Sequence, residues 1–194
     1  MKNILNPEIL HKNLILLSIF IATYEFSKDI IITRPKDLFI TGFDDAEITI
    51  SPDYKKHVLS RNKSPLYASL DWFKEQSAID QNDIQIFEEI KNTRNEAVHE
   101  MMTIIKNGPS KKFEQALKNL TTLLYKIEKW WFVEIEFPII ADRYPTITDP
   151  KEAFPGTMLL VKIIQEIALG DENERNRIYE EFIKKTSTNK QTST

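Results

Sequence analysis

The sequence predicts an all-α protein, an up-and-down bundle of about four to five helices with further helices towards the C-terminus. Apolar residues recur at helical spacing along most of the 194-residue chain, and prolines stand where these periodic segments begin or end. Only 4 glycines are present, few for a glycine-rich nucleotide-binding fold. The length fits one domain, which we place at residues 1–185, followed by a polar tail at 186–194 that we expect to be disordered.

The first helix is predicted to begin at Pro7, with Asn6 as its N-cap, and to end near Ile32, before Pro35. It contains an apolar run at 14–22, which is shorter than the roughly 20 residues that a membrane span needs. The residues that follow this run lack a convincing signal-peptide cleavage site. We therefore expect the central helix of a soluble, cytoplasmic bundle without a membrane contact.

An irregular insertion is predicted at about 33–63. Its β-branched and aromatic residues alternate around Gly42, a pattern that indicates a small hairpin or an ordered loop, and a short helix follows at 52–59. The insertion carries basic residues that could follow an RNA backbone: Lys55, Lys56, His57, Arg61 and Lys63. A solvated loop explains them at least as well, because four acidic residues between 44 and 53 dilute the charge.

The remaining helices are predicted at 65–78, 81–106, 111–137, 157–169 and 171–185, with a proline-rich connection at 138–156. Near the end of the 111–137 helix stand three aromatic residues, Trp130, Trp131 and Phe132. They could stack on bases. Core packing is the preferred interpretation, because aromatic side chains at the end of a core helix are usually buried.

The composition excludes several kinds of chemistry. The chain has no cysteine, so disulfides, thiolate catalysis and cysteine-ligated metal centres are excluded, and a reducing cytosol fits. A net charge of −3 argues against general nucleic-acid coating, so any such contact needs a local patch. Asp142 and Asp149 have no histidine partners close in sequence, and we predict neither a metal site nor a cofactor.

The helix predicted at 81–106 organises the chain. Asp80 and Asp83 form an approximate capping box at its start, and Gly108 follows as a stop signal. One broad apolar face runs along it: Ile84, Ile86, Phe87, Ile90, Ala97, Val98, Met101, Ile104 and Ile105. Arg94 falls near the middle of this face. Because arginine is rarely buried without a partner, the face either meets another polar surface or opens into a cleft.

Arg94 is followed by Asn95 and, after three further residues, by His99. A guanidinium pairs well with a phosphate, an imidazole can move a proton near neutral pH, and an amide can orient either group. This trio suits the cleavage of RNA by its own 2′-hydroxyl, which needs no metal. A single helix supplies one arginine and one histidine, whereas a symmetric homodimer would present two of each in one cleft.

At these residues the sequence resembles the HEPN family, whose signature is an arginine, four to six intervening residues and a histidine. A polar residue, commonly asparagine, follows the arginine, and Arg94, Asn95 and His99 match this pattern at its shortest spacing. The resemblance implies a helical dimer with both motifs in one cleft. Many members are metal-independent ribonucleases of toxin–antitoxin, phage-defence and CRISPR-associated systems.

We therefore expect an endoribonuclease that acts as a toxin or defence effector on an RNA substrate, with an antitoxin or another defence protein as a further partner. Glu96 is expected either to orient the catalytic pair or to lie on the solvated back of the helix with Glu100. The alternative is a non-catalytic HEPN-like module that dimerises or docks a partner through the same face. In that case Arg94 forms a structural salt bridge.

Overall fold

The structure is a computed structural model that describes residues 5–44, 47–143, 149–170, 176–177 and 180. It confirms the all-α class and the two-stranded hairpin in the insertion. The helices are α1 (Pro7–Asp37), α2 (Pro52–His57), α3 (Pro65–Glu75), α4 (Gln81–His99), α5 (Met101–Asn107), α6 (Lys111–Trp131), α7 (Phe137–Ile140) and α8 (Gly156–Leu169). The charged helix predicted at 171–185 and the tail at 186–194 fall almost wholly outside the described residues.

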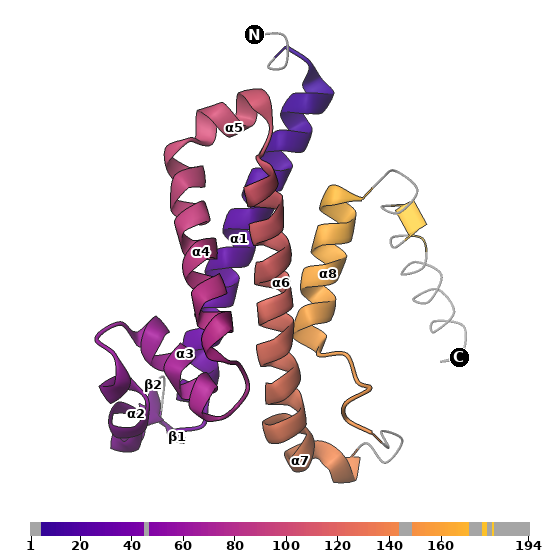
Figure 1. The fold of residues 1–194 in the computed structure, drawn as a ribbon. Coiled ribbons are helices and arrows are strands. Elements are labelled where there is room, and N and C mark those ends of the chain that lie inside the picture. The colour runs from indigo at the N-terminus through magenta and orange to yellow at the C-terminus, as the bar shows by residue number, and fades with distance from the viewer. Residues whose placement is uncertain (1–4, 45–46, 144–148, 171–175, 178–179, 181–194) are drawn as a thin grey trace, which may run out of the picture.

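Helices α1, α4 and α6 run side by side along the molecule, α5 crosses one end, and α8 lies beside α6 (Figure 1). The insertion occupies the other end, where β1 (Ile40–Asp44) pairs antiparallel with β2 (Glu47–Ile50). Helix α1 packs against α3, α4, α5, α6 and α8. It is therefore the central helix that its apolar run predicts. None of the described helices has the length and apolarity that a membrane crossing requires.

Helix α1 is longer than predicted, because Pro35 does not end it. Asn6 accepts hydrogen bonds from the backbone N–H groups of Glu8 and Ile9, which confirms the predicted cap. Pro35 is buried in the last turn, where its missing N–H removes a single helical hydrogen bond. The neighbouring Arg34 is tied to α6, and the helix therefore continues to Asp37.

The core is aromatic at both ends of the bundle. Phe20 of α1 lies 4.4 Å from Phe113 of α6, measured between ring centroids. Trp131 is 4% exposed, and Trp130 packs at 6.0 Å against Trp72 of α3. The tryptophan pair is therefore part of the protein interior, as its place at the end of a core helix predicts, and base stacking by Trp131 is excluded.

A buried ion pair connects α1 to the end of α6. Arg34 donates from Nε and Nη2 to the two oxygens of Glu128, both at 2.8 Å, and from Nη1 to Glu136 at 3.0 Å. The Glu128 side chain is 1% exposed. Glu136 also accepts from the Trp131 indole N–H. The helix predicted at 111–137 widens into a π-helical turn at Phe132–Glu136, and this turn contains Glu136.

The prediction of a single helix at 81–106 is wrong, since the chain bends at Glu100 between α4 and α5. The bend packs Ile104 and Ile105 against the core, and the buried Asn13 of α1 donates to the Ile105 carbonyl at 3.0 Å. Gly108 then turns the chain into α6 with a φ of 87°. His99 consequently stands at the end of α4 rather than inside a continuous helix.

Candidate active-site face of helix α4

Helix α4 begins with the predicted capping box. The Asp80 carboxylate accepts from the Asp83 backbone N–H at 2.9 Å, and the Asp83 carboxylate accepts from the Asp80 N–H at 2.8 Å. The buried stripe of the helix consists of Phe87, Ile90, Thr93 and Ala97. Val98 and Met101, which were predicted in this stripe, are each 38% exposed. The stripe is therefore narrower than predicted, and Arg94 lies at its edge rather than at its centre.

Arg94 reaches towards α1. Its Nη2 donates to Glu25 Oε1 at 2.6 Å, and its Nη1 makes a long contact of 3.4 Å with Asn95 Oδ1. The guanidinium carbon lies 5.5 Å from the centre of the Tyr24 ring, within cation–π range. The charge of Arg94 is thus matched by a carboxylate of its own bundle. This is the arrangement that the non-catalytic alternative predicts.

Arg34 and Arg94 both form ion pairs between α1 and another helix, but the two pairs differ in how fully they satisfy the guanidinium. Arg34 uses all three of its nitrogens on carboxylates, one of which is fully buried. Arg94 makes one short bond to a carboxylate that is 38% exposed, while its own side chain is 29% exposed. Its Nε is buried without a hydrogen-bond partner among the described residues. Arg94 is therefore incompletely satisfied, which is unusual for a structural arginine.

Glu25 is shared between two cations. It pairs with Lys28, one turn along α1, and with Arg94 across the helix interface. The Lys28 ammonium, and after it the Arg94 guanidinium, holds the pKa of Glu25 below its ordinary value. Burial raises the pKa of the adjacent Tyr24, so its phenol is neutral near pH 7. Arg94 and Lys28 thus share one anion, Glu25, beside the neutral ring of Tyr24.

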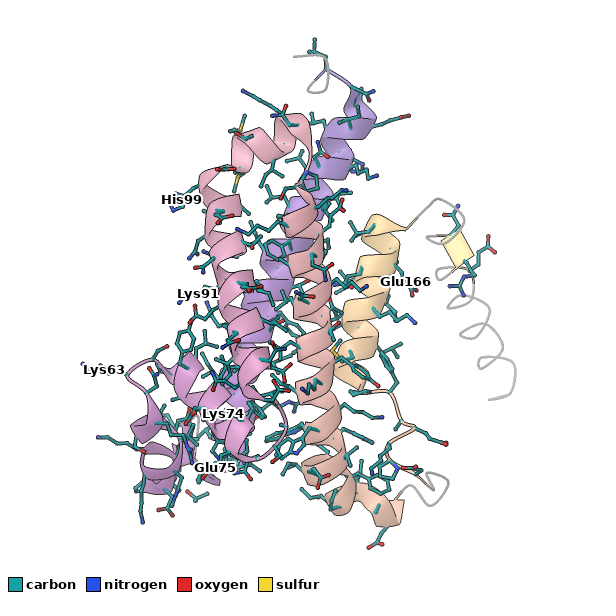
Figure 2. The ribbon with its side chains drawn as sticks, in the orientation of Figure 1. Lys63, Lys74, Glu75, Lys91, His99 and Glu166 are labelled. Atoms are coloured by element: carbon teal, nitrogen blue, oxygen red, sulfur yellow. The ribbon has the colours of Figure 1, made fainter. Side chains whose placement is uncertain are left out.

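His99 is exposed at the last position of α4, and it makes no hydrogen bond or ion pair with any other described residue. Figure 2 shows it projecting away from the bundle. Because five residues turn a helix by about 140° beyond one full turn, Arg94 and His99 point to different sides of α4. Asn95 lies between them. One protomer therefore does not bring the guanidinium and the imidazole together.

A groove of about 620 Å³ runs between α4 and α6. Asn95 and His99 line it, together with the carboxamides of Asn92, Gln115 and Asn119. Glu96 also faces this groove, where its carboxylate pairs with Lys112 of α6 at 2.7 Å. Since Glu96 is held by Lys112, the structure gives it no contact through which it could orient Arg94 or His99.

Sequence reasoning missed Lys91 and Tyr67. The Lys91 ammonium donates to the Tyr67 hydroxyl at 2.7 Å and lies 4.8 Å from the centre of that ring. Lys91 stands one turn before Arg94, so its spacing in the sequence was a usable signal. Tyr67 belongs to α3 and carries no local signal. In Figure 2 Lys91 and His99 project from the same edge of α4. We call Lys91, Arg94, Asn95, Val98 and His99 the motif face.

The basic residues of the insertion lie elsewhere. Arg61 contacts Asp71 at 3.5 Å and pairs with Glu75, so its charge is matched within the insertion end of the bundle. Lys55, Lys56 and Lys63 are exposed. They belong to α2 and the loop after it, at the opposite end of α4 from His99 (Figure 1, Figure 2). The structure does not join this group to the motif face.

Comparison with known proteins adds no family assignment. No family model matches the chain, and neither a curated protein nor a solved structure is similar to it at a significant level. Within the described ranges, no three His, Asp or Glu side chains gather closely enough to hold a metal ion.

Proposed function

We propose that the chain is a metal-independent endoribonuclease that acts as a homodimer and serves as a toxin or phage-defence effector. The observation that supports this is the incomplete satisfaction of Arg94. Its Nε has no hydrogen-bond partner among the described residues, and its side chain is 29% exposed at the edge of α4, next to Asn95. A guanidinium with unused donors suits a phosphate ligand better than a purely structural pair does.

The roles follow from the chemistry of the groups. His99 transfers a proton at the 2′-hydroxyl or at the leaving 5′-oxygen, and Arg94 holds and neutralises the scissile phosphate. Asn95 orients the pair through its contact with the guanidinium. The 2′-oxygen attacks the adjacent phosphorus and the bond to the 5′-oxygen breaks. The products are a 2′,3′-cyclic phosphate and a 5′-hydroxyl.

A second copy of the chain is part of this proposal, because Arg94 and His99 of one protomer point to different sides of α4. A symmetric interface would place the histidine of one copy near the arginine of the other. Val98, Met101 and Met102 are 38%, 38% and 60% exposed next to His99. Exposed apolar side chains of this kind are commonly covered in an interface.

The test is an RNA cleavage assay in EDTA with purified protein. We expect cutting by the wild type, loss of cutting in His99→Ala and Arg94→Gln, and products with a cyclic phosphate. His57→Ala is the matched control, because His57 is an exposed histidine of α2 at the other end of the molecule. Cutting that requires added magnesium, or that survives His99→Ala, refutes the mechanism.

The second candidate is a non-catalytic module that dimerises or docks a partner protein, such as an antitoxin, through the motif face. The Arg94–Glu25 pair favours it, since the guanidinium already has a carboxylate in its own bundle. Expression in a bacterial host separates the two candidates. Growth inhibition that disappears in both Arg94→Ala and His99→Ala supports the nuclease, whereas inhibition unchanged in both variants supports the module.

A further inference from the structure

We propose that Lys91 is a second phosphate-binding residue of the motif face, and that it holds the RNA phosphate next to the one bound by Arg94. This inference rests on the proposed function, because it takes RNA as the ligand. It adds a residue outside the arginine–histidine pattern. Lys91 is placed by its position on α4 and by its contact with Tyr67 of another helix.

The Lys91 ammonium group differs from other lysines of the bundle in its partner. Lys74 of α3 and Lys112 of α6 each bind a carboxylate directly, with N–O distances of 2.8 and 2.7 Å. Lys91 instead donates to the phenol of Tyr67, and its nearest carboxylate, that of Glu88, lies at 3.8 Å. An ammonium has three donors. Only one of them is used in a short hydrogen bond here, and Glu88 offsets the charge as an ion-pair partner at longer range.

Tyr67 orients the Lys91 ammonium without cancelling its charge. Burial raises the pKa of the Tyr67 phenol, so it is neutral near pH 7. Its hydroxyl and its ring both contact Lys91, at 2.7 Å and 4.8 Å. A flexible lysine held by two neutral contacts loses less side-chain freedom when it binds an anion. The Lys91 side chain is 36% exposed and can reach a ligand from solvent.

Lys91 lies three residues before Arg94 on α4. Residues three apart on a helix are neighbours, with Cβ atoms about 5–6 Å apart. Lys91 and Arg94 therefore form a cationic pair on one side of α4. Lys91 and His99 project from the same edge of this helix (Figure 2). Glu25 and Glu88 are the carboxylates that face this pair, and Lys28 offsets the first of them. The edge thus has a net positive charge, as a phosphate backbone requires.

Binding of a labelled single-stranded RNA to the His99→Ala protein, measured by fluorescence anisotropy, tests this inference without cleavage. Each phosphate contact contributes about 0.7 to the slope of log K against log salt for a single strand. We expect Lys91→Gln to lower the slope by about 0.7. Its loss of affinity should then be roughly 2.6-fold larger at about 50 mM than at about 200 mM salt. Lys91→Arg keeps the charge and should keep the slope.

Lys74→Gln is the matched control, because Lys74 has the same 36% side-chain exposure and pairs with Asp71. Its slope should equal that of the parent protein. An unchanged slope in Lys91→Gln, or an equal decrease in Lys74→Gln, overturns the role of Lys91 even if the wild type cleaves RNA. If RNA binding depends on Lys91 but the wild-type protein never cleaves RNA, the role of Lys91 is supported and the proposed nuclease activity is refuted. If the protein does not bind RNA, both the role of Lys91 and the proposed nuclease activity are refuted.

Discussion

Two ion pairs of the same chemical type should differ in their contribution to stability, and this difference tests whether Arg94 is a structural residue. The Arg34–Glu128 pair is bidentate, with Glu128 at 1% exposure, whereas the Arg94–Glu25 pair has one short bond and side chains that are 29% and 38% exposed. Breaking a buried pair by removing one partner costs about 3–5 kcal/mol. An exposed pair contributes about 0–1 kcal/mol.

We therefore expect Glu128→Gln to lower the free energy of unfolding by about 3 kcal/mol, because Arg34 keeps Glu136 but loses its buried partner. With a urea dependence of roughly 1–3 kcal/mol per molar, the unfolding midpoint falls by about 1 M or more. Glu25→Gln should lower the free energy of unfolding by about 1 kcal/mol at most. Both variants are compared by urea unfolding followed by circular dichroism.

The result that would refute this reasoning is a loss in Glu25→Gln as large as the loss in Glu128→Gln. Arg94 would then be needed for the fold, and the structural interpretation of its ion pair would gain over the catalytic one. A small loss in Glu25→Gln leaves Arg94 free to exchange its carboxylate for a phosphate. If the chain binds RNA as proposed, this variant should bind it at least as tightly as the wild type, since it removes the anion that contacts Arg94.

Three further predictions concern the fold around the motif. Gly108→Ala should cost roughly 1–3 kcal/mol in urea unfolding, because a φ of 87° strains any residue with a Cβ atom. Asn13→Ala should cost about 1–3 kcal/mol and speed hydrogen exchange in α5, because the partly buried Ile105 carbonyl loses its donor. The pKa values of Glu25 and Asp71 are lowered in the folded protein, from ordinary values of 4.5 and 3.8. Their contribution is therefore present above those values and is lost as the pH falls below about 4, which a series of unfolding curves between about pH 6 and pH 2 would measure.

Sequence patterns located most helices, because caps and helical spacing are local signals. The Asn6 cap and the Asp80–Asp83 capping box both form as their residue types predict. The Glu100 bend carried no such signal. It arises because Ile104 and Ile105 pack on the core with the distant Asn13, an interaction 92 residues apart in sequence.

Some residues of the candidate site could be predicted from the sequence, and others could not. The sequence alone singled out Arg94, Asn95 and His99, since the three share one short stretch of one helix. It did not indicate Glu25 or Tyr67, which reach α4 from α1 and α3. Their roles depend on how the helices pack against one another. A sequence pattern with a period of one helical turn does not contain that information.

The sequence by itself determined the helical class, the helix starts and the chemical groups available on α4, because these follow from residue types at short spacing. The tertiary structure decided which of these groups are already occupied. Burial and long-range pairing leave Glu96 bound to Lys112 and Arg94 only partly bound to Glu25. They leave Lys91 hydrogen-bonded to the neutral Tyr67 phenol of another helix, with Glu88 as a more distant ion-pair partner.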